Sequence, residues 1–521
     1  MRPLTSENAC WAYGDLAWSI DRVRWNAKPV REREIKLLID ADVELPPLEK
    51  LLSGCGSWTT ETVVLEAVYF DTWDLRLTRS GVSLRYRSDD GWCVKTPEAR
   101  DGDVFVRREH AFGEGFGNPP RAAIELVVPW ARSETVSEVA RITTRRQKTR
   151  VCDAGGRLVC EIDDDEVAGV VDGRPPVHFR EIEIETHDDG EPHIVTTVAK
   201  RLRKAGAGQC PALPKVARVL GDRAVAPPDL PAAPHLDRSS TTTDLVSASI
   251  IAAVQSLLDN DPVVRAGEDP EGVHRARVAT RRLRSHLHTF RPIVDNDWSE
   301  SLRAELQWLA EQLGHVRDPD VLLHRLTAKA GELPPDLRVA SRALTDRLRV
   351  ARDRDRAALL DAMRSPRYTT LLDNLVGASQ RPRMRNPDRA ALAKDSARRL
   401  TRNPWKGLRA TVTALPRSPS SIELHDVRKQ AKRARYAFEA TMPVIGKKVQ
   451  RAGRRLADLQ DLLGDQHDAI VAMDWLHSAA RDEPNSEVAF AAGALAASFA
   501  DDERRARRRW PTAWRRVKRA I

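Results

Sequence analysis

The pattern of hydrophobic and polar positions changes once along the chain, near residue 221. Before it, short runs of alternating apolar and polar residues are separated by turns rich in Gly and Asp, which is typical of β-strands. After it, Gly is sparse, and long Ala-, Leu- and Arg-rich segments follow a helical period. We therefore predict a mostly β domain over residues 30–220 and an α-helical domain over residues 236–521.

Two segments follow neither pattern. Residues 221–235 contain four prolines, so by composition this stretch is a semi-rigid linker between the two domains. Residues 1–29 show no clear period, and we predict an N-terminal arm without an assigned role.

Charged residues alternate along one predicted strand. In the segment 31–37, Glu32, Glu34 and Lys36 share one face, because alternate side chains of a strand point the same way. Three charges on one face are unfavourable in a packed core unless that face meets water, a metal or an ionic ligand. For this strand alone, a solvated outer face is an equally good interpretation.

The same alternation recurs on further strands, with both signs of charge. Basic faces carry Arg85, Arg87 and Lys95, and acidic faces carry Glu161, Asp163, Asp165, Glu181, Glu183 and Glu185. A sheet closed into a barrel can turn all of these faces inward around a polar tunnel. Grouped carboxylates suit hard ions such as Mg²⁺ or Mn²⁺, and Arg and Lys suit phosphate oxygens.

These residues resemble the CYTH family, the triphosphate tunnel metalloenzymes. The sequence from Glu32 to Lys36 is similar to the family's Glu-x-Glu-x-Lys motif, and residues 69–87 are similar to its second block, Tyr-x-Asp-Thr followed by Leu-Arg-x-Arg. The resemblance implies an antiparallel eight-stranded tunnel and a metal-dependent hydrolase of inorganic triphosphate or a related triphosphate compound. The alternatives are a class IV-type adenylyl cyclase and a non-catalytic protein that binds polyphosphate or targets its granules.

The resemblance also implies roles for the matched residues. Glu32 and Glu34 match metal ligands for Mg²⁺ or Mn²⁺. Asp165 matches a later metal ligand, with Asp163 as its competitor. Glu181 and Glu183 match the last pair of ligands, and Glu185 can replace either of them. The residues that match triphosphate-binding cations are Lys36, Arg85, Arg87, Lys95, Arg146 and Lys215. A second metal ion or one of the carboxylates would then activate the attacking water.

The predicted helical domain contains an internal repeat. Residues 273–284 are similar to residues 424–435, and residues 313–318, further along, are similar to residues 463–468. Two matched blocks in the same order and spacing indicate a duplicated helical bundle.

Each copy places a basic stripe on one helix face. The stripe residues are His274, Arg277, Arg281 and Arg284 in the first copy and His425, Arg428, Lys432 and Arg435 in the second. Their spacing aligns them on a helix. A single stripe is more often a solvated face balanced by acidic neighbours, but two matched stripes favour an anionic ligand. Metal ligation by histidine is the less favoured alternative, because the other histidines of the first helix lie off the stripe.

This half resembles the CHAD family of helical domains with conserved histidines. His274 and His425 match those histidines, and Arg317 lies in a Leu-Gly-x-x-Arg-Asp block in which the second copy has His467. The resemblance implies two four-helix bundles around a basic groove that binds inorganic polyphosphate. Nucleic acid is the rival polyanion, but no nucleic-acid-reading motif or aromatic platform accompanies the stripes.

Composition agrees with a polyanionic partner in a reducing compartment. The net charge is +10 and the pI is about 9.4, which favours polyanions. The six cysteines form no Cys-x-x-Cys pair, which disfavours a zinc site or a disulfide framework. No apolar run is long enough to span a bilayer, and the N-terminus does not resemble a signal peptide. We predict a cytoplasmic protein, free or associated with polyphosphate granules.

Overall fold

The computed structural model describes residues 30–54, 56–101, 104–113, 115–186, 192–209, 214–267, 269–481 and 483–521. The arm predicted at residues 1–29 lies outside these ranges. The chain forms two compact units, which meet in sequence between Asp229 and Leu230.

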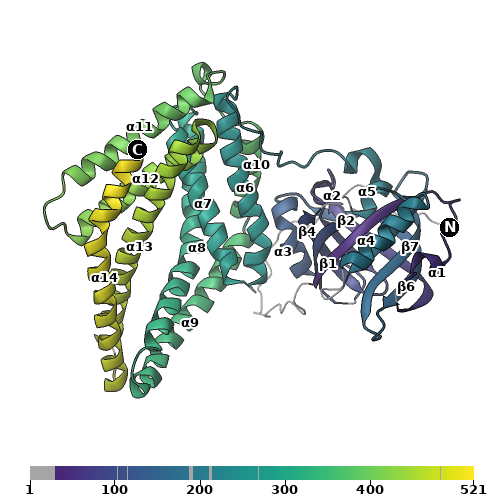
Figure 1. The fold of residues 1–521 in the computed structure, drawn as a ribbon, viewed down its shortest axis with the longest axis horizontal. Helices are drawn as coiled ribbons and strands as arrows, with labels where there is room; N and C mark the ends of the chain where they lie inside the picture. Colours follow the sequence, from purple (N-terminus) through teal and green to yellow (C-terminus); the bar gives the residue numbers. More distant parts are fainter. Residues whose placement is uncertain are drawn as a thin grey trace, which may run out of the picture. The chain divides into compact units, whose positions relative to one another are not determined.

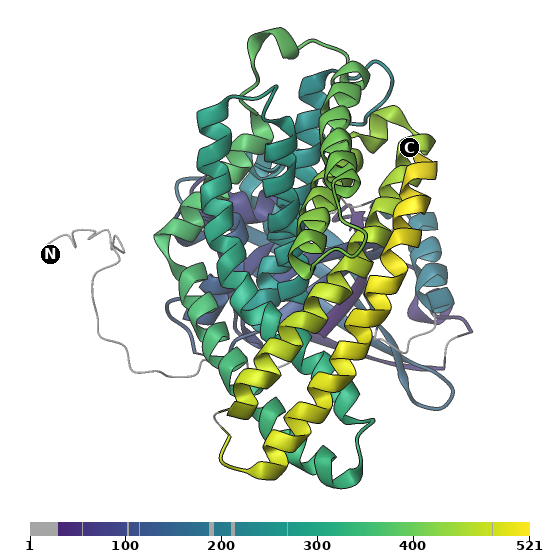
Figure 2. The same ribbon diagram turned by 90° about the vertical axis from the view of Figure 1, so that its left-hand side faces the viewer.

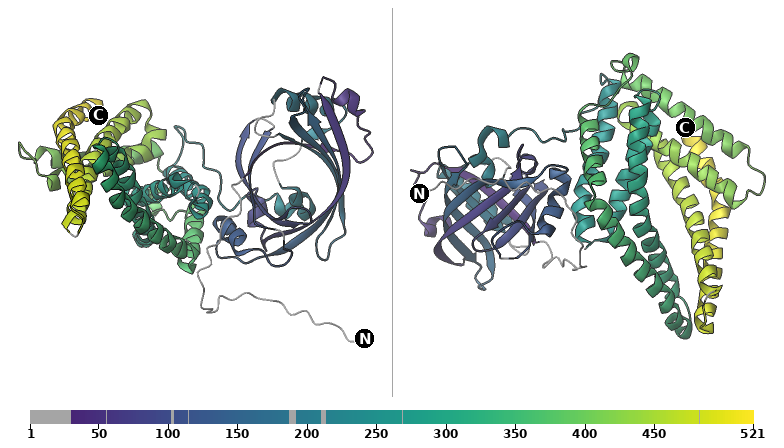
Figure 3. Two further views of the ribbon diagram at one scale, coloured as in Figure 1. Left: turned by 90° about the horizontal axis from the view of Figure 1, so that it is seen from below. Right: turned by 180° about the vertical axis from the view of Figure 1, so that it is seen from behind.

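In the first unit, eight antiparallel strands close into a barrel, which Figure 3 (left) shows end-on. The order around the barrel is β5-β4-β3-β2-β6-β7-β8-β1, and β1 pairs back onto β5, while a short β9 adds to β1. The strands are β1 (Val30–Ile39), β2 (Ser57–Thr72), β3 (Ser83–Arg87), β4 (Gly91–Asp101), β5 (Val104–Ala111), β6 (Val136–Cys152), β7 (Leu158–Val170), β8 (Val177–Thr186) and β9 (Gly208–Gln209).

On β1, charged and aliphatic side chains alternate between the inside and the outside of the barrel. On β1, Glu34 and Lys36 line the inner cavity, whereas Ile35 and Leu37 belong to an outer hydrophobic core. The helix α4 (Pro192–Lys204) contributes to this core and covers it, together with α1 (Leu48–Leu51) (Figure 1). The charged faces therefore lie inside because the alternate aliphatic faces are buried under helices.

Three further helices complete the barrel unit. The helix α3 (Arg121–Ala131) packs with α2 (Arg76–Arg79) over the outer face of β3 and β4. The helix α5 (Lys215–Leu220) packs against Ala67, Tyr69 and Ile142, and its first residue lines the inner cavity. A 3₁₀ turn, η1 (Gly221–Ala224), follows α5.

A buried aspartate fixes the connection from β2 to β3. Asp71 accepts hydrogen bonds from the backbone N–H groups of Thr72, Leu77 and Thr78 at 2.7 to 2.9 Å, and from the Thr78 hydroxyl at 2.7 Å. The Tyr-x-Asp-Thr block of the sequence thus has a structural role: it sets where β3 begins.

In the described part of the second unit, two similar sets of four helices are joined by one additional helix (Figure 2). The first set is α6 (Thr242–Ala266), α7 (Pro270–Phe290), α8 (Asn296–Ala330) and α9 (Pro335–Arg364). The helix α10 (Pro366–Gln380) and a 3₁₀ turn, η2 (Asn386–Asp388), precede the second set. That set is α11 (Ala393–Thr413), α12 (Ser421–Ile445), α13 (Lys447–Arg481) and α14 (Ser486–Ala520).

Local sequence signals account for the starts of these helices. Thr241 and Ser420 form capping boxes with Asp244 and Glu423 at the beginning of α6 and α12. Aliphatic side chains of α8, α9, α13 and α14 form one core, and α11 to α14 form another. The predicted fold class, an eight-stranded antiparallel tunnel followed by a helical domain, is confirmed, and α10 is an addition to the predicted bundles.

Candidate functional site

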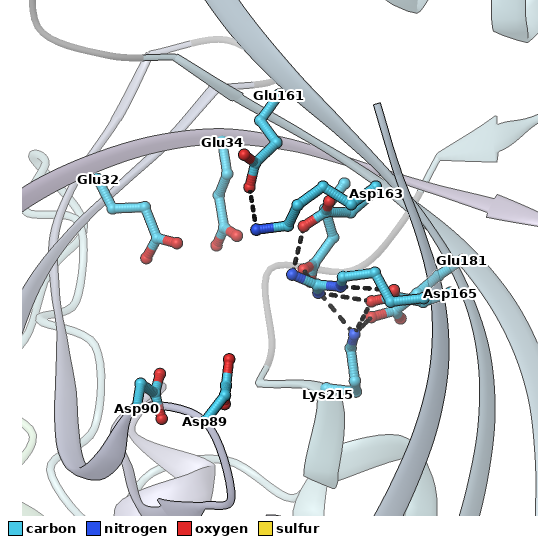
Figure 4. Close-up of polar contacts among 12 residues, drawn as sticks. Glu32, Glu34, Asp89, Asp90, Glu161, Asp163, Asp165, Glu181 and Lys215 are labelled. Carbon is cyan, nitrogen blue, oxygen red and sulfur yellow. Dashed lines mark hydrogen bonds and ion pairs between the residues drawn. The ribbon is translucent and has the colours of Figure 1, made fainter. Parts of the chain in front are cut away.

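The inner surface of the barrel is divided by charge. The adjacent strands β7, β8 and β1 carry the carboxylates, and their register places Asp165 beside Glu181, and Glu185 beside both Glu161 and Glu34. We call the full set the acidic wall: it consists of Glu32, Glu34, Glu161, Asp163, Asp165, Glu181, Glu183 and Glu185. Figure 4 labels all of them except Glu183 and Glu185.

The acidic wall contains three groups of carboxylates whose oxygen atoms lie within 4.8 Å of one another. The groups are Glu32 with Glu34 and Glu185, Glu161 with Asp163 and Glu185, and Asp165 with Glu181 and Glu183. Asp163 and Asp165 are fully buried, and Asp163 Oδ1 accepts no hydrogen bond from the described residues. Each group has the oxygen donors that a hard divalent cation prefers.

Cations from the neighbouring strands pair with this wall. Lys95 donates to Glu32 at 2.8 and 2.9 Å, and Arg107 contacts Glu34 at 3.0 Å. Lys36 contacts Glu34 at 3.2 Å and also pairs with Glu183.

A second set of pairs is centred on Asp165. Arg146 forms two hydrogen bonds to it, at 2.8 and 2.7 Å, and a third to Glu183 at 3.0 Å. Lys215, at the start of α5, pairs with Asp165 and contacts Glu181 at 3.1 Å. The buried charges of the acidic wall and of the cations that face it are therefore compensated by direct contacts.

The carboxyl groups of the acidic wall differ in pKa. Burial by itself would raise the pKa of Glu32, but Lys95 and a hydrogen bond from Glu185 bring this pKa down to about 2. Burial raises the pKa of Asp163 to about 7, since Arg146 only partly offsets burial and three other carboxylates lie close. Burial and the neighbouring Glu32 also raise the pKa of Glu185. Burial and the nearby carboxylates thus favour the protonated forms of Asp163 and Glu185.

Two arginines of the tunnel pair outside the acidic wall. Arg85 Nη2 lies 2.9 Å from Asp90 Oδ2, and Arg87 lies 2.5 Å from Asp89 and 2.6 Å from Asp90. Both aspartates belong to the turn between β3 and β4.

The structure brings all thirteen tunnel residues selected from the sequence into one site, in the cavity lining or in the acidic wall. Sequence reasoning missed Arg107, which shares one face of β5 with Phe105 and Glu109 and lines the cavity. It also gave no role to Lys148, which lies 2.7 Å from Glu161. The signal for Arg107 was present in the alternation, but the adjacent Arg108 obscured which arginine faces inward.

In the helical unit, α7 packs against α12, and the two basic stripes meet. Burial and then the charges of Arg281, Arg428 and Arg284 lower the pKa of Lys432 to about 8, so cations of both helices surround this ammonium group. We call the eight stripe residues together with Arg317 and His467 the basic groove.

The basic groove has donors without acceptors. The Nε–H groups of Arg281, Arg284 and Arg317 are buried and have no hydrogen-bond acceptor in the described part of the chain. Buried donors of this kind are unfavourable unless a ligand satisfies them. Burial and neighbouring cations lower the pKa values of His274, His425 and His467. The neutral imidazole is therefore favoured in the free groove, and a bound phosphate would favour the imidazolium.

In both halves of the groove, the glycine of the Leu-Gly block lies beside an arginine of the basic stripe, but the two arginines differ in their ion pairs. A Cβ at Gly314 would lie 3.8 Å from the guanidinium of Arg277, and one at Gly464 would lie 3.8 Å from that of Arg428. Arg277 pairs with Asp318 at 2.6 Å. Arg428 has no carboxylate partner among the described residues.

Each half of the chain matches the model of a known protein family. A family model described as CYTH domain matches residues 30–208, and one described as CHAD domain matches residues 248–477. The uncharacterized protein Rv2226 of Mycobacterium tuberculosis is 30% identical over 520 residues, covering 95% of this chain and 98% of that protein. The chain belongs to the CYTH–CHAD family. CYTH domains are metal-dependent and fit an enzyme family of the triphosphatase or cyclase type, and the acidic wall lies in this domain.

Two solved structures are also similar to this CYTH–CHAD protein. PptA from Streptomyces chartreusis is 27% identical, with a TM-score of 0.45, and covers 53% of this chain and 100% of its own. The CHAD domain from the plant Ricinus communis is 27% identical, with a TM-score of 0.43, and covers 53% of this chain and 94% of its own. Among the described helices, none is long and apolar enough to cross a membrane.

Proposed function

We propose that the CYTH domain is a metal-dependent hydrolase of inorganic triphosphate or a related triphosphate compound, and that the CHAD domain binds inorganic polyphosphate. The supporting observation is a closed barrel in which an acidic wall faces Arg and Lys side chains from the other strands. Carboxylates for a cation and guanidinium groups for phosphate are both needed for a triphosphate substrate, and neither set alone would suit it.

The residues of the acidic wall fit Mg²⁺ or Mn²⁺. They offer only oxygen donors, in three groups, and Asp163 has a buried oxygen without a hydrogen-bond donor in the described residues. A bound ion of this kind would neutralise phosphate oxygens and lower the pKa of a water molecule.

The side chains of the chain itself would perform the remaining work. Lys36, Lys95, Arg107 and Arg146 would exchange their carboxylate partners for phosphate oxygens, since phosphate also accepts charge-assisted hydrogen bonds. These cations would stabilise the charge that spreads over the transferring phosphoryl group. One carboxylate of the acidic wall would accept the proton of the attacking water.

Replacement of Glu34 by Gln tests the catalytic proposal. Glu34 is buried and contacts Lys36 and Arg107, so Glu34→Gln should reduce metal-dependent phosphate release by at least about a hundredfold. The matched control is Glu66→Gln, an exposed position on β2. Triphosphate, long-chain polyphosphate, ATP and thiamine triphosphate would each be incubated with Mg²⁺ or Mn²⁺. Phosphate, pyrophosphate and cyclic AMP would be measured. Unchanged turnover in Glu34→Gln would contradict the proposal, and cyclic AMP from ATP would favour a cyclase.

The polyphosphate proposal is tested on the basic groove. The double variant Arg277→Gln with Arg428→Gln should weaken binding of labelled long-chain polyphosphate. The double variant Arg282→Gln with Arg433→Gln, exposed positions one residue beyond stripe members, is the control. If nucleic acid displaced the labelled chain at equal phosphate concentration, specificity for polyphosphate would fail. Binding through the groove would also bring the protein to polyphosphate granules.

A further inference from the structure

The turn between β3 and β4 places two carboxylates on the arginines of β3. Arg87 Nε and Nη2 donate to Asp89 at 2.5 and 3.1 Å, and Arg85 Nη2 donates to Asp90 at 2.9 Å. Figure 4 shows Asp89 and Asp90 across the tunnel from Glu32 and Glu34. The turn is held in place, because Ser88 exchanges hydrogen bonds with the backbone of Glu66 on β2.

This arrangement separates Arg85 and Arg87 from the other cations that line the cavity. Within the described residues, each of the other lining cations pairs with at least one member of the acidic wall. The pairs of the acidic wall are almost fully buried, whereas the side chains of Asp89 and Asp90 are 45% and 29% exposed. Ion pairs that reach solvent are weak, and buried pairs are costly to break.

The cavity itself leaves little room for a ligand. Its volume is about 60 Å³, enough for a few water molecules. A phosphate chain that binds the same nitrogens of Arg85 and Arg87 has to displace Asp90 and Asp89. The partly exposed pairs at the β3–β4 turn are the ones that it can displace at the smallest free-energy penalty.

From this geometry we infer that Asp89 and Asp90 weaken substrate binding by competing with the substrate for Arg85 and Arg87. The inference rests on the proposed triphosphate function. A carboxylate fills the same guanidinium fork that a phosphate group would fill. A highly charged triphosphate outcompetes the two aspartates, whereas a diphosphate, with fewer charges and a shorter reach, does so poorly. The turn thus lowers the affinity of any phosphate chain that engages both arginines.

The test compares the double variant Asp89→Asn with Asp90→Asn against the unmodified protein. Isothermal titration calorimetry in Mg²⁺ would measure dissociation constants of methylene-bridged analogues of triphosphate and diphosphate, which cannot be hydrolysed. Each released pair contributes about a two- to fivefold change. We therefore expect the triphosphate analogue, which reaches both arginines, to bind about four- to twenty-five-fold more tightly, and the diphosphate analogue, with its shorter reach, to gain less. The preference for triphosphate over diphosphate should therefore grow.

Two further variants help to interpret the result. Glu138→Gln removes a comparable Arg–carboxylate pair, Arg141 with Glu138 at 2.7 Å, from the outer surface of the barrel, and its affinities should not change. The single variant Asp90→Asn frees both arginines of one partner. It replaces the double variant if that protein folds poorly, and its gain in affinity should be smaller.

Unchanged or weaker binding in the aspartate variants, with normal binding by the unmodified protein, would overturn the inference and leave the proposed function standing. If the unmodified protein bound neither analogue, the proposed function would fail, and the inference would fail with it.

Discussion

At the residue scale, Lys432 carries its charge among other cations. Burial and the arginines of α7 and α12 lower its pKa to about 8, so the free ammonium group begins to lose its proton only slightly above neutral pH. A bound polyanion would raise that pKa again, because it stabilises the charged form. Binding of polyphosphate therefore takes up a proton above pH 8.

The affinity for polyphosphate should consequently fall as the pH rises from 7 to 9. The loss attributable to Lys432 is about tenfold one pH unit above its pKa. In Lys432→Arg this part of the decline should disappear, since arginine stays charged. Equilibrium binding at constant ionic strength measures it, with Lys429→Arg as the control, an exposed residue of the same helix that pairs with Asp426. Parallel pH profiles for the unmodified protein and Lys432→Arg would contradict this prediction.

At the element scale, the connection from β2 to β3 depends on Asp71. The Asp71→Ala variant would leave three backbone N–H groups and one hydroxyl without their acceptor, and we expect it to destabilise the barrel by about 3 kcal/mol. Urea unfolding followed by a barrel-specific signal would measure this change. Asp172→Ala, an exposed residue of the β7–β8 turn, should have little effect. Equal stability of the two variants would show that the hydrogen bonds do not hold the connection.

Also at this scale, the two copies of the helical repeat should contribute unequally. Arg277 is held by Asp318 at 2.6 Å, whereas Arg428 has no carboxylate partner in the described residues. A phosphate chain must displace a carboxylate at the first position but not at the second. Arg428→Gln should therefore weaken polyphosphate binding more than Arg277→Gln, by about two- to fivefold. Fluorescence titration of the two single variants at one salt concentration decides it, and equal losses would refute the asymmetry.

At the scale of the whole molecule, each unit has hydrophobic cores of its own. We expect two thermal transitions in the intact chain, because each unit should unfold cooperatively. Triphosphate with Mg²⁺ should raise only the barrel transition, and polyphosphate should raise chiefly the helical one. At a ligand concentration of one hundred times Kd, the stabilisation is about 2.7 kcal/mol. Differential scanning calorimetry measures both effects. A single transition that moved with either ligand would show that the units unfold together.

The sequence by itself determined the organisation of this protein. Alternation with period two placed charged residues on one face of each strand, and the helical repeat was visible because its residues stayed similar. Glu32, Glu34 and Lys36 could be selected because a strand has only two faces and this one is charged. The basic stripes could be selected for the same reason, since spacing along one helix fixes the face.

Only the tertiary structure decided which charges meet. Closure of the barrel brings Glu185 against both Glu32 and Asp163, although sequence reasoning offered Glu185 only as a replacement for Glu181 or Glu183. It also gives Asp89 and Asp90 to the arginines of β3, and it turns Arg107 rather than Arg108 inward. The physical reason is that spacing along a chain fixes the direction of a side chain within its own element. Contacts between elements depend on strand register and on the packing of helices, which no local pattern encodes.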